Sequence, residues 1–220
     1  MKVGSDAIIL SMLSPKGIEP KNILDIGCGC GIITLSMADT YPNANIIGID
    51  IDNESIIEAG ANFEASIFAD RLRAKSISLK EFASNSKKEF DLIVSNPPFF
   101  INSLESKDPR RNKARHSSSL SYEELIAVSS KLLSPQGILS IIIPFQNKEV
   151  LERIAIENGL VAIQRYHILS RPKEEPIRIL FHFSKQGLRS SSHKEITIRN
   201  SDNSLNDSFK LLSSRFLVYN

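Results

Sequence analysis

The sequence predicts a doubly wound α/β fold, in which helices cover both faces of a mostly parallel sheet. Short apolar runs typical of buried strands alternate along the chain with segments of helical periodicity, as in successive β-α-β units. A chain of 220 residues is long enough for one domain of this kind with a full core, and too short for two. We therefore expect a single domain over residues 1–220.

The first half of the chain is expected to form four strands and two helices. The strands are the apolar runs at 23–26, 45–49, 75–79 and 90–94, of which the third is the weakest. Helical spacing covers 32–38 and 54–68, and Asn53 is expected to cap the second of these helices.

The second half continues the alternation after a long segment without periodicity. Residues 96–120 are rich in Pro, Asn, Ser and basic side chains, and loops of that length in a compact domain are usually functional or disordered. Ser121 and Glu124 match a capping box at the start of the next helix, and Pro135-Gln136-Gly137 reads as a turn. The expected helices are 121–133, 147–158 and 205–217, and the expected strands are 138–143, 160–169 and 177–183.

Composition excludes several classes of protein. Hydrophobic residues make up 41% of the chain and charged residues 24%, as in ordinary soluble domains. No apolar run approaches the ~20 residues of a membrane span, and the N-terminus lacks the pattern of a signal peptide. Cys28 and Cys30 are too close in sequence for a disulfide and lack further ligands for zinc, so we expect buried thiols, no metal and a cytoplasmic setting.

A glycine-rich loop joins the first expected strand to the first helix. It runs Asp25-Ile26-Gly27-Cys28-Gly29-Cys30-Gly31, and its glycines allow a sharp turn and a close approach of ligand to main-chain amides. Asp50 ends the next strand, where a carboxylate can accept hydrogen bonds from ribose hydroxyls. This combination predicts a nucleoside-containing cofactor, with a tight turn that binds nothing as the alternative.

A second motif, Ser95-Asn96-Pro97-Pro98-Phe99-Phe100, follows the fourth strand, at the edge where doubly wound sheets bind ligands. An exocyclic amine on a base is a poor nucleophile because its lone pair is delocalised into the ring. The Asn96 side-chain oxygen and the Pro97 carbonyl are two acceptors that can hold the amine hydrogens, with the prolines fixing the backbone. Phe99 offers a face on which a base can stack. The alternative interpretation is a proline-rich turn.

The glycine loop resembles motif I of class I S-adenosylmethionine methyltransferases, and Asn-Pro-Pro-Phe resembles motif IV of their amino-methylating members. The resemblance implies a Rossmann-like sheet of seven strands, mostly parallel with one antiparallel strand. It implies that Asp50 holds the ribose, while Ser78 stands where the family often has an Asp near the adenine ring. The implied cofactor-binding residues are Asp25, Gly27, Gly29, Gly31, Asp50, Ser78 and Asn96, and the implied catalytic residues are Asn96, Pro97 and Phe99.

Further segments narrow the resemblance. The opening Lys2-Val3-Gly4-Ser5-Asp6, the basic stretch 111–116 and the closing helix, together with the motif at 96–100, are similar to the bacterial valine-tRNA adenine-37 N6-methyltransferase family over nearly the whole chain. The family methylates the exocyclic N6 amine of an adenine in tRNA, and basic residues would neutralise phosphates while the adenine is splayed out. The implied RNA-binding residues are Phe99, Phe100, Lys107, Arg110, Arg111, Lys113 and Arg115.

Three alternatives to this function stay open on sequence grounds. One is guanine-N2 methylation of ribosomal RNA, another is N5-methylation of a protein glutamine, and the last is a non-catalytic RNA-binding module. The partners expected are tRNA and S-adenosylmethionine, with no membrane, and the protein is expected to be a monomer. The histidines are assigned no catalytic role; they are His116, His167, His182 and His193.

Overall fold

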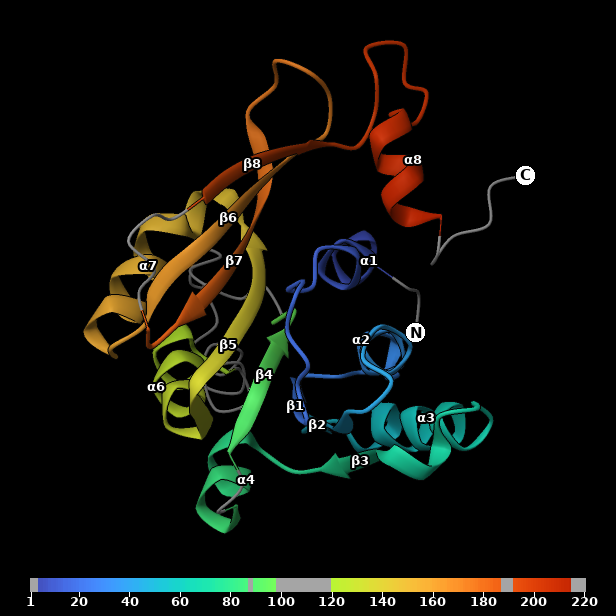
Figure 1. Cartoon of the computed structure of the whole chain (residues 1–220), viewed down its shortest axis with the longest axis vertical. Coiled ribbons are helices and arrows are strands. Elements are labelled where there is room, and N and C mark those ends of the chain that lie inside the picture. The colour runs from blue at the N-terminus through green and yellow to red at the C-terminus, as the bar shows by residue number, and fades with distance from the viewer. Residues whose placement is uncertain (1–3, 87–88, 98–119, 187–191, 215–220) are drawn as a thin grey trace, which may run out of the picture.

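A computed structural model describes residues 4–86, 89–97, 120–186 and 192–214 (Figure 1). Its centre is a sheet of eight strands in the order β3-β2-β1-β4-β5-β7-β6-β8. Only β7, among the described strands, runs against its neighbours, because it pairs antiparallel with both β5 and β6 while β6 and β8 pair in parallel. The strands are β1 Asn22–Ile26, β2 Asn45–Asp50, β3 Leu72–Ser76, β4 Phe90–Ser95, β5 Leu133–Pro144, β6 Val161–Leu169, β7 Pro176–Ser184 and β8 Ser192–Thr197.

Helices cover both faces of the sheet, as predicted (Figure 1). Side chains alternate along each strand, so that Ile23 joins the core under α1, α2, α3 and α8, whereas Leu24 joins the core under α4, α6 and α7. No helix in the described ranges combines the length and the apolar character that crossing a membrane requires. The helices are α1 Ser5–Met12, α2 Ile32–Thr40, α3 Asn53–Glu64, α4 Leu79–Asn85, α6 Tyr122–Leu132, α7 Lys148–Glu157 and α8 Asp207–Ser213, with short 3₁₀ turns η1 Ala69–Arg71 and η2 Phe145–Asn147.

The expected count of seven strands is wrong by one. The additional strand, β8, lies at the edge of the sheet and pairs with β6. Its sequence, Ser-His-Lys-Glu-Ile-Thr, contains a single apolar residue. An edge strand that pairs on one side and exposes much of its surface needs few apolar residues, so it leaves a weak sequence signal.

Three local predictions are also corrected. The third strand ends at Ser76 instead of continuing to residue 79, because Ser78 begins α4 by accepting a hydrogen bond from the Glu81 amide. The cap of α3 is Asp52, whose carboxylate accepts from the amides of Glu54 and Ser55, and not Asn53. The predicted turn at 135–137 lies within β5, where the pairing with β4 is irregular. Ser121 caps α6 as predicted, accepting from the Glu124 amide.

Candidate active site

Three adjacent strands bring the two sequence motifs to one edge of the sheet. β1 lies between β2 and β4, and the register places Ile26 opposite both Ile49 and Ser95. The strands are parallel, so the glycine loop, Asp50 and Asn96 all follow the carboxyl ends of neighbouring strands. After β1 the chain adds β2 and β3 on one side and then crosses to β4 on the other side. Doubly wound sheets bind their ligands at such a reversal of strand order.

The glycine loop turns through backbone conformations that favour glycine. Gly27, Gly29 and Gly31 have φ values of 72°, 53° and 84°. The amides of Gly27 and Cys28 both donate to the Ile49 carbonyl, at 2.9 and 3.0 Å, which fixes the loop on the end of β2. A Cβ on Gly27 would meet nothing within 4 Å, so the space beside this residue is open to a ligand.

Asp25 is the buried anchor beneath this loop. Its side chain is fully buried and its Oδ2 accepts a 2.7 Å hydrogen bond from the Thr34 hydroxyl on α2. Burial raises the pKa of the Asp25 carboxyl to about 7, against the lowering effect of the bonds from Thr34. Among the described residues no donor reaches Oδ1, so one buried oxygen is free for a cationic or hydrogen-bonding ligand.

Asp50 fastens the middle of the same loop. Its Oδ2 accepts from the Gly29 amide at 2.9 Å and its Oδ1 accepts from the Asp52 amide at 3.0 Å. A carboxylate oxygen has two lone pairs, so both oxygens keep capacity for a hydroxyl donor. Ser78, the expected adenine contact, lies two positions beyond the end of β3 and its hydroxyl is engaged with the Glu81 amide. The adjoining Ile77 amide donates to the Asp50 carbonyl, which keeps this segment beside the end of β2.

The second motif is held against the glycine loop by a residue that the sequence did not single out. The Ser95 hydroxyl is buried and donates to the Ile26 carbonyl at 2.9 Å, tying the last residue of β4 to the last residue of β1. Asn96 follows directly and is half-buried, and its Oδ1 is buried without a donor among the described residues. Pro97 is buried. The other predicted site residues lie outside the described residues: Phe99, Phe100, Lys107, Arg110, Arg111, Lys113 and Arg115.

Gly48 is a further contributor that sequence reasoning missed. A Cβ at this position would lie 2.9 Å from the Cys28 sulfur and 3.1 Å from the Thr34 hydroxyl. The absence of a side chain in the middle of β2 therefore lets both groups pack over the strand, and an isolated glycine within an apolar strand was the available signal. Burial and the nearby Asp25 raise the pKa of the Cys28 thiol above its usual range, so it stays protonated and unreactive.

The opening segment is tied to the far half of the sheet. Arg178 of β7 donates from Nε to Asp6 Oδ2 of α1 at 2.9 Å, and both side chains are mostly buried. In the β5–β7 register Arg178 lies opposite Pro144, the last residue of β5. The Asp6–Arg178 ion pair therefore lies at the same carboxyl edge as the glycine loop. The Gly4-Ser5-Asp6 element therefore stands at the edge that carries the site.

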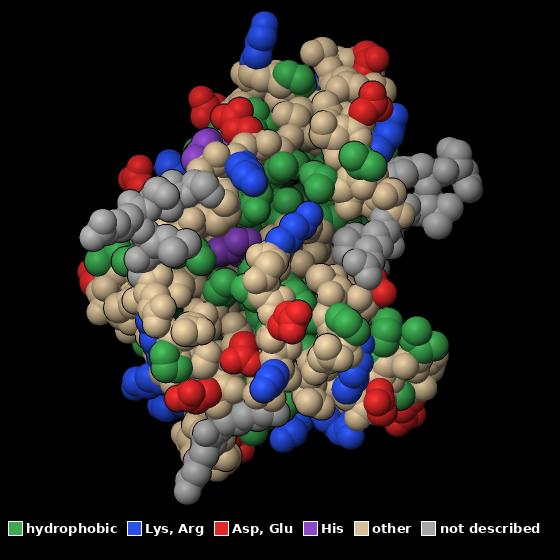
Figure 2. Space-filling view, viewed as in Figure 1, with side chains coloured by type: hydrophobic (Ala, Val, Ile, Leu, Met, Phe, Trp, Pro, Cys, Tyr) green, Lys and Arg blue, Asp and Glu red, His purple; other side chains and the backbone are tan. Residues whose placement is uncertain are grey.

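Basic residues of the C-terminal half are largely engaged within the chain. Arg165 pairs with Glu152, Arg171 pairs with Glu174, and the Lys185 ammonium donates to the Leu133 carbonyl. Figure 2 shows Lys and Arg interspersed with Asp and Glu on this face rather than gathered in one patch. The C-terminal basic residues thus offer a weaker anionic-ligand surface than their number in the sequence indicates.

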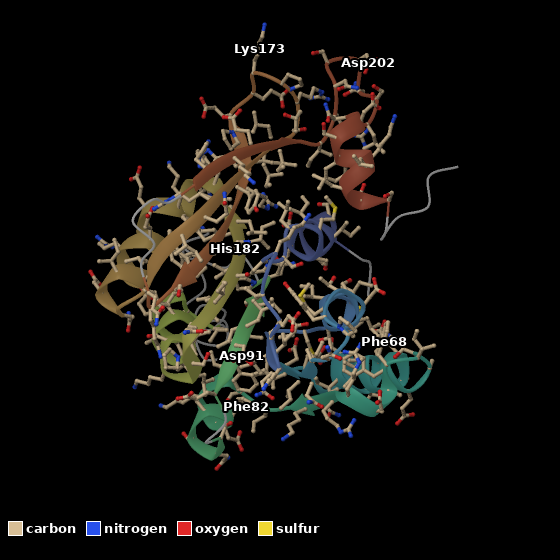
Figure 3. All side chains as sticks on the ribbon, in the orientation of Figure 1. Phe68, Phe82, Asp91, Lys173, His182 and Asp202 are labelled. Atoms are coloured by element: carbon tan, nitrogen blue, oxygen red, sulfur yellow. The ribbon has the colours of Figure 1, made fainter. Side chains whose placement is uncertain are left out.

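A buried histidine serves the fold instead of the site. His182 of β7 lies beside α1 (Figure 3), where its Nε2 donates to the Leu13 carbonyl at 2.9 Å and its Nδ1 accepts from the Ser140 hydroxyl at 2.8 Å. Burial lowers the pKa of His182 to about 4, so the imidazole is neutral at physiological pH.

Comparison with known proteins places the chain in a family. Residues 2–168 match the methyltransferase small domain family. A tRNA1(Val) (adenine(37)-N6)-methyltransferase from Parabacteroides distasonis is 34% identical over 218 residues, covering 99% of this chain and 91% of the relative. One of the same name from Porphyromonas gingivalis is 40% identical over 186 residues, covering 82% and 73%.

A solved structure supports the fold independently. The crystal structure of a predicted O-methyltransferase from Agrobacterium tumefaciens superposes with a TM-score of 0.73 at 18% identity, covering 97% of this chain and 98% of the other. Taken with the sequence relatives, the chain belongs to the methyltransferase small domain family and, within it, to the tRNA1(Val) (adenine(37)-N6)-methyltransferases.

Proposed function

We propose that the protein transfers a methyl group from S-adenosylmethionine to the exocyclic N6 amine of an adenine in tRNA, at position 37 of a valine tRNA. The observation that carries this proposal is the buried Oδ1 of Asn96, which has no partner within the described part of the chain and lies at the carboxyl edge beside the glycine loop. The tRNA, the base and the position come from the names of the curated relatives.

An unpaired buried acceptor is unfavourable in the protein alone. Leaving such a group without a donor costs about 1–3 kcal/mol. Asn96 keeps this arrangement because the short Ser95–Ile26 link holds its backbone at the end of β4. The oxygen is therefore available to accept a hydrogen bond from one N–H of an incoming amine. The Pro97 carbonyl is the proposed acceptor for the other N–H.

Two acceptors on an aromatic amine solve the chemical difficulty of the reaction. Holding both hydrogens turns the nitrogen so that its lone pair leaves the ring system and faces the methyl donor. Pre-aimed polar groups of this kind act without rearranging during the reaction, which is the main source of their catalytic effect. After transfer, the methylated nitrogen is acidic enough to release a proton to water, so the chain needs no strong base.

The residues around the glycine loop fit the cofactor. Open space lies beside Gly27, a buried Asp25 oxygen receives no donor from the residues that the structure describes, and Asp50 keeps lone pairs for ribose hydroxyls. When bound, S-adenosylmethionine supplies an electrophilic methyl group on a sulfonium. We propose that Asp25 orders the loop, that the backbone of the three loop glycines contacts the methionine part, and that Ser78 contributes to the adenine side.

The tRNA is proposed to be held by the segment that follows the Asn-Pro-Pro-Phe motif. Phe99 and Phe100 would stack on the extruded base, worth about 1–3 kcal/mol per base. The proposed phosphate contacts, which neutralise the backbone, are Lys107, Arg110, Arg111, Lys113 and Arg115. We further propose that residues 1–220 act as one domain and as a monomer in the cytoplasm.

Nucleoside analysis tests the proposal. Transfer RNA from a strain that lacks the gene is digested and analysed by mass spectrometry before and after incubation with purified protein and cofactor. The expected result is N6-methyladenosine in the valine tRNA only after incubation. Valine tRNA that still lacks N6-methyladenosine after incubation would refute the proposal, and the same incubation with ribosomal RNA or protein would then test for methylguanosine or methylglutamine.

A further inference from the structure

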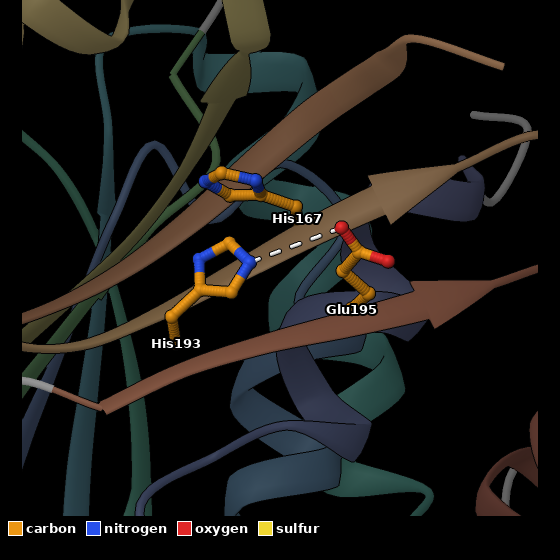
Figure 4. Close-up of side chains that lie close together, drawn as sticks. All are labelled: His167, His193 and Glu195. Atoms are coloured by element: carbon orange, nitrogen blue, oxygen red, sulfur yellow. Dashed lines mark ion pairs between the residues drawn. The ribbon is translucent and has the colours of Figure 1, made fainter. Parts of the chain in front are cut away.

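Two histidines and a glutamate that are dispersed in the sequence come together on one face of the sheet edge. β6 and β8 pair in parallel, with His167 opposite Glu195 and Arg165 opposite His193. Residues paired in this way, and residues two apart on a strand, share a face. His167, His193 and Glu195 therefore project from the same side of these two strands (Figure 4).

The three side chains are close enough to share one ion. Their potential ligand atoms all lie within 4.8 Å of one another, and the His193 Nε2 to Glu195 Oε1 distance is 3.9 Å. Ligand atoms around a tetrahedral zinc ion are separated by about 3.3 Å, given bonds of about 2.0–2.1 Å. Closing the site needs only side-chain rotations, since His193 and Glu195 are exposed and free to turn.

The packing of the two imidazoles also suits a ligand pair. The rings of His167 and His193 have centroids 4.0 Å apart and planes at 89°, and the rings of His167 and Phe145 have centroids 4.9 Å apart and planes at 77°. The contact with Phe145 restricts the rotation of the His167 ring. Imidazole is mostly neutral near pH 7 and so can ligate a metal there.

The surrounding charges permit a cation. Two basic side chains lie near His167, but Arg165 is paired with Glu152, and Lys148 lies over the Phe145 ring and within 3.6 Å of Glu149. Glu195 supplies one negative charge directly. The His193 and Glu195 side chains are 48% and 63% exposed, which leaves room for water to complete the coordination.

We propose that His167, His193 and Glu195 form a zinc-binding site that fastens the edge strand β8 to β6. Two imidazoles and one carboxylate, with water in the fourth position, are an established zinc donor set. This departs from the metal-free chain expected from sequence, because the ligands come from two strands that only the fold places together. β8 leads to α8, which packs on α1, so the clamp would stabilise the whole C-terminal arm.

The test is a zinc titration of the untagged, chelator-treated full chain, followed by calorimetry and by imidazole nitrogen NMR. We expect one Zn²⁺ per chain, shifts confined to His167 and His193, and a melting temperature that rises with Zn²⁺ but not with Mg²⁺, which prefers oxygen ligands. His193→Gln and Glu195→Gln should each weaken Zn²⁺ binding by about 10-fold or more.

Matched controls separate this site from adventitious binding. His116→Gln and Glu175→Gln remove the same side-chain types elsewhere and should leave Zn²⁺ affinity within about twofold of the parent. Circular dichroism checks that each variant is folded. The proposal would be overturned if the parent chain bound no stoichiometric Zn²⁺. It would also be overturned if His193→Gln bound Zn²⁺ with unchanged affinity, even where the ion is then held by the cysteines.

Discussion

The protonation of Asp25 gives a direct test of how the glycine loop binds its cofactor. The carboxyl is fully buried and its pKa is raised to about 7, so near pH 6 it is mostly protonated in the free protein. The proposed cofactor carries an ammonium and a sulfonium, which favour the carboxylate. Binding should therefore expel a proton at any pH below 7, and affinity should rise as the pH approaches 7 from below.

The size of the effect follows from that pKa. If only the carboxylate form binds, affinity falls about fivefold between pH 7 and pH 6, and about 0.9 proton is released on binding at pH 6. Isothermal calorimetry in two buffers of different ionisation enthalpy counts this proton. The comparison of affinities is restricted to pH 7 and below, because α-amino groups, such as that of the cofactor, titrate near 7.7–8.0 and would add their own pH dependence.

Asp25→Asn is the informative variant because it keeps an acceptor for Thr34 and cannot ionise. Its cofactor affinity should be weaker than that of the parent at pH 7 and independent of pH from 6 to 7. A folded-state pKa raised from 3.8 to about 7 means that stability is fully present below 3.8 and is lost as the pH rises through 7. At pH 8 the variant should therefore unfold at a higher urea concentration than the parent. Its free energy of unfolding should exceed that of the parent by at most on the order of 4 kcal/mol. An affinity that is constant between pH 6 and 7 in the parent, or equally pH-dependent in the variant, would refute this reasoning.

Three further predictions concern the two motifs and the buried histidine. Asn96→Ala should lower turnover by about 10²-fold while the cofactor dissociation constant, measured by calorimetry, stays within about twofold; an equal loss of cofactor binding would contradict the proposed role. Asp50→Ala should weaken cofactor binding by ~1.5–3 kcal/mol, and an unchanged dissociation constant would mean that Asp50 only holds the Gly29 amide. The pKa of His182 is lowered to about 4. The neutral imidazole therefore contributes to the free energy of unfolding fully above the unfolded-state pKa of about 6.5, and a contribution on the order of 3 kcal/mol is lost as the pH falls toward 4. Urea unfolding should show this loss in an Asp25→Asn background, which removes the opposite pH dependence of that carboxyl, and adding His182→Gln should abolish it. If the free energy of unfolding changed with pH equally with and without His182→Gln, the prediction would be wrong.

The strands that could be predicted from sequence are those buried on both faces. β1, β2, β4 and the central part of β5 read as apolar runs because helices cover them on both sides, and most of their apolar residues are buried. The short helices α1 and α4 were not predicted. α1 carries apolar residues around most of its surface, so it lacks a clear helical stripe, and α4 is too short to establish a period.

The site divides in a similar way. Asp25, the loop glycines, Asp50 and Asn96 were identifiable because each occupies a fixed offset from a strand end, and the structure places them at one edge. Ser95, Thr34 and Gly48 act through contacts between neighbouring strands or with the helix above. Such contacts join residues without fixed spacing in the chain, so the local sequence does not reveal these roles; of the three, Gly48 carries a local signal, as an isolated glycine within an apolar strand.

By itself, the sequence determined the alternation of strands and helices, the glycine turn and the acceptors of the Asn-Pro-Pro-Phe segment, because these depend on composition and short-range spacing. Only the tertiary structure decided which groups lack partners and which meet. The Asp25 and Asn96 oxygens that have no donor among the described residues, the Asp6–Arg178 pair and the cluster of His167, His193 and Glu195 all depend on strand register and burial. Those are set by the packing of the whole chain, since a side chain's solvation and neighbours are properties of the folded surroundings and not of its local sequence.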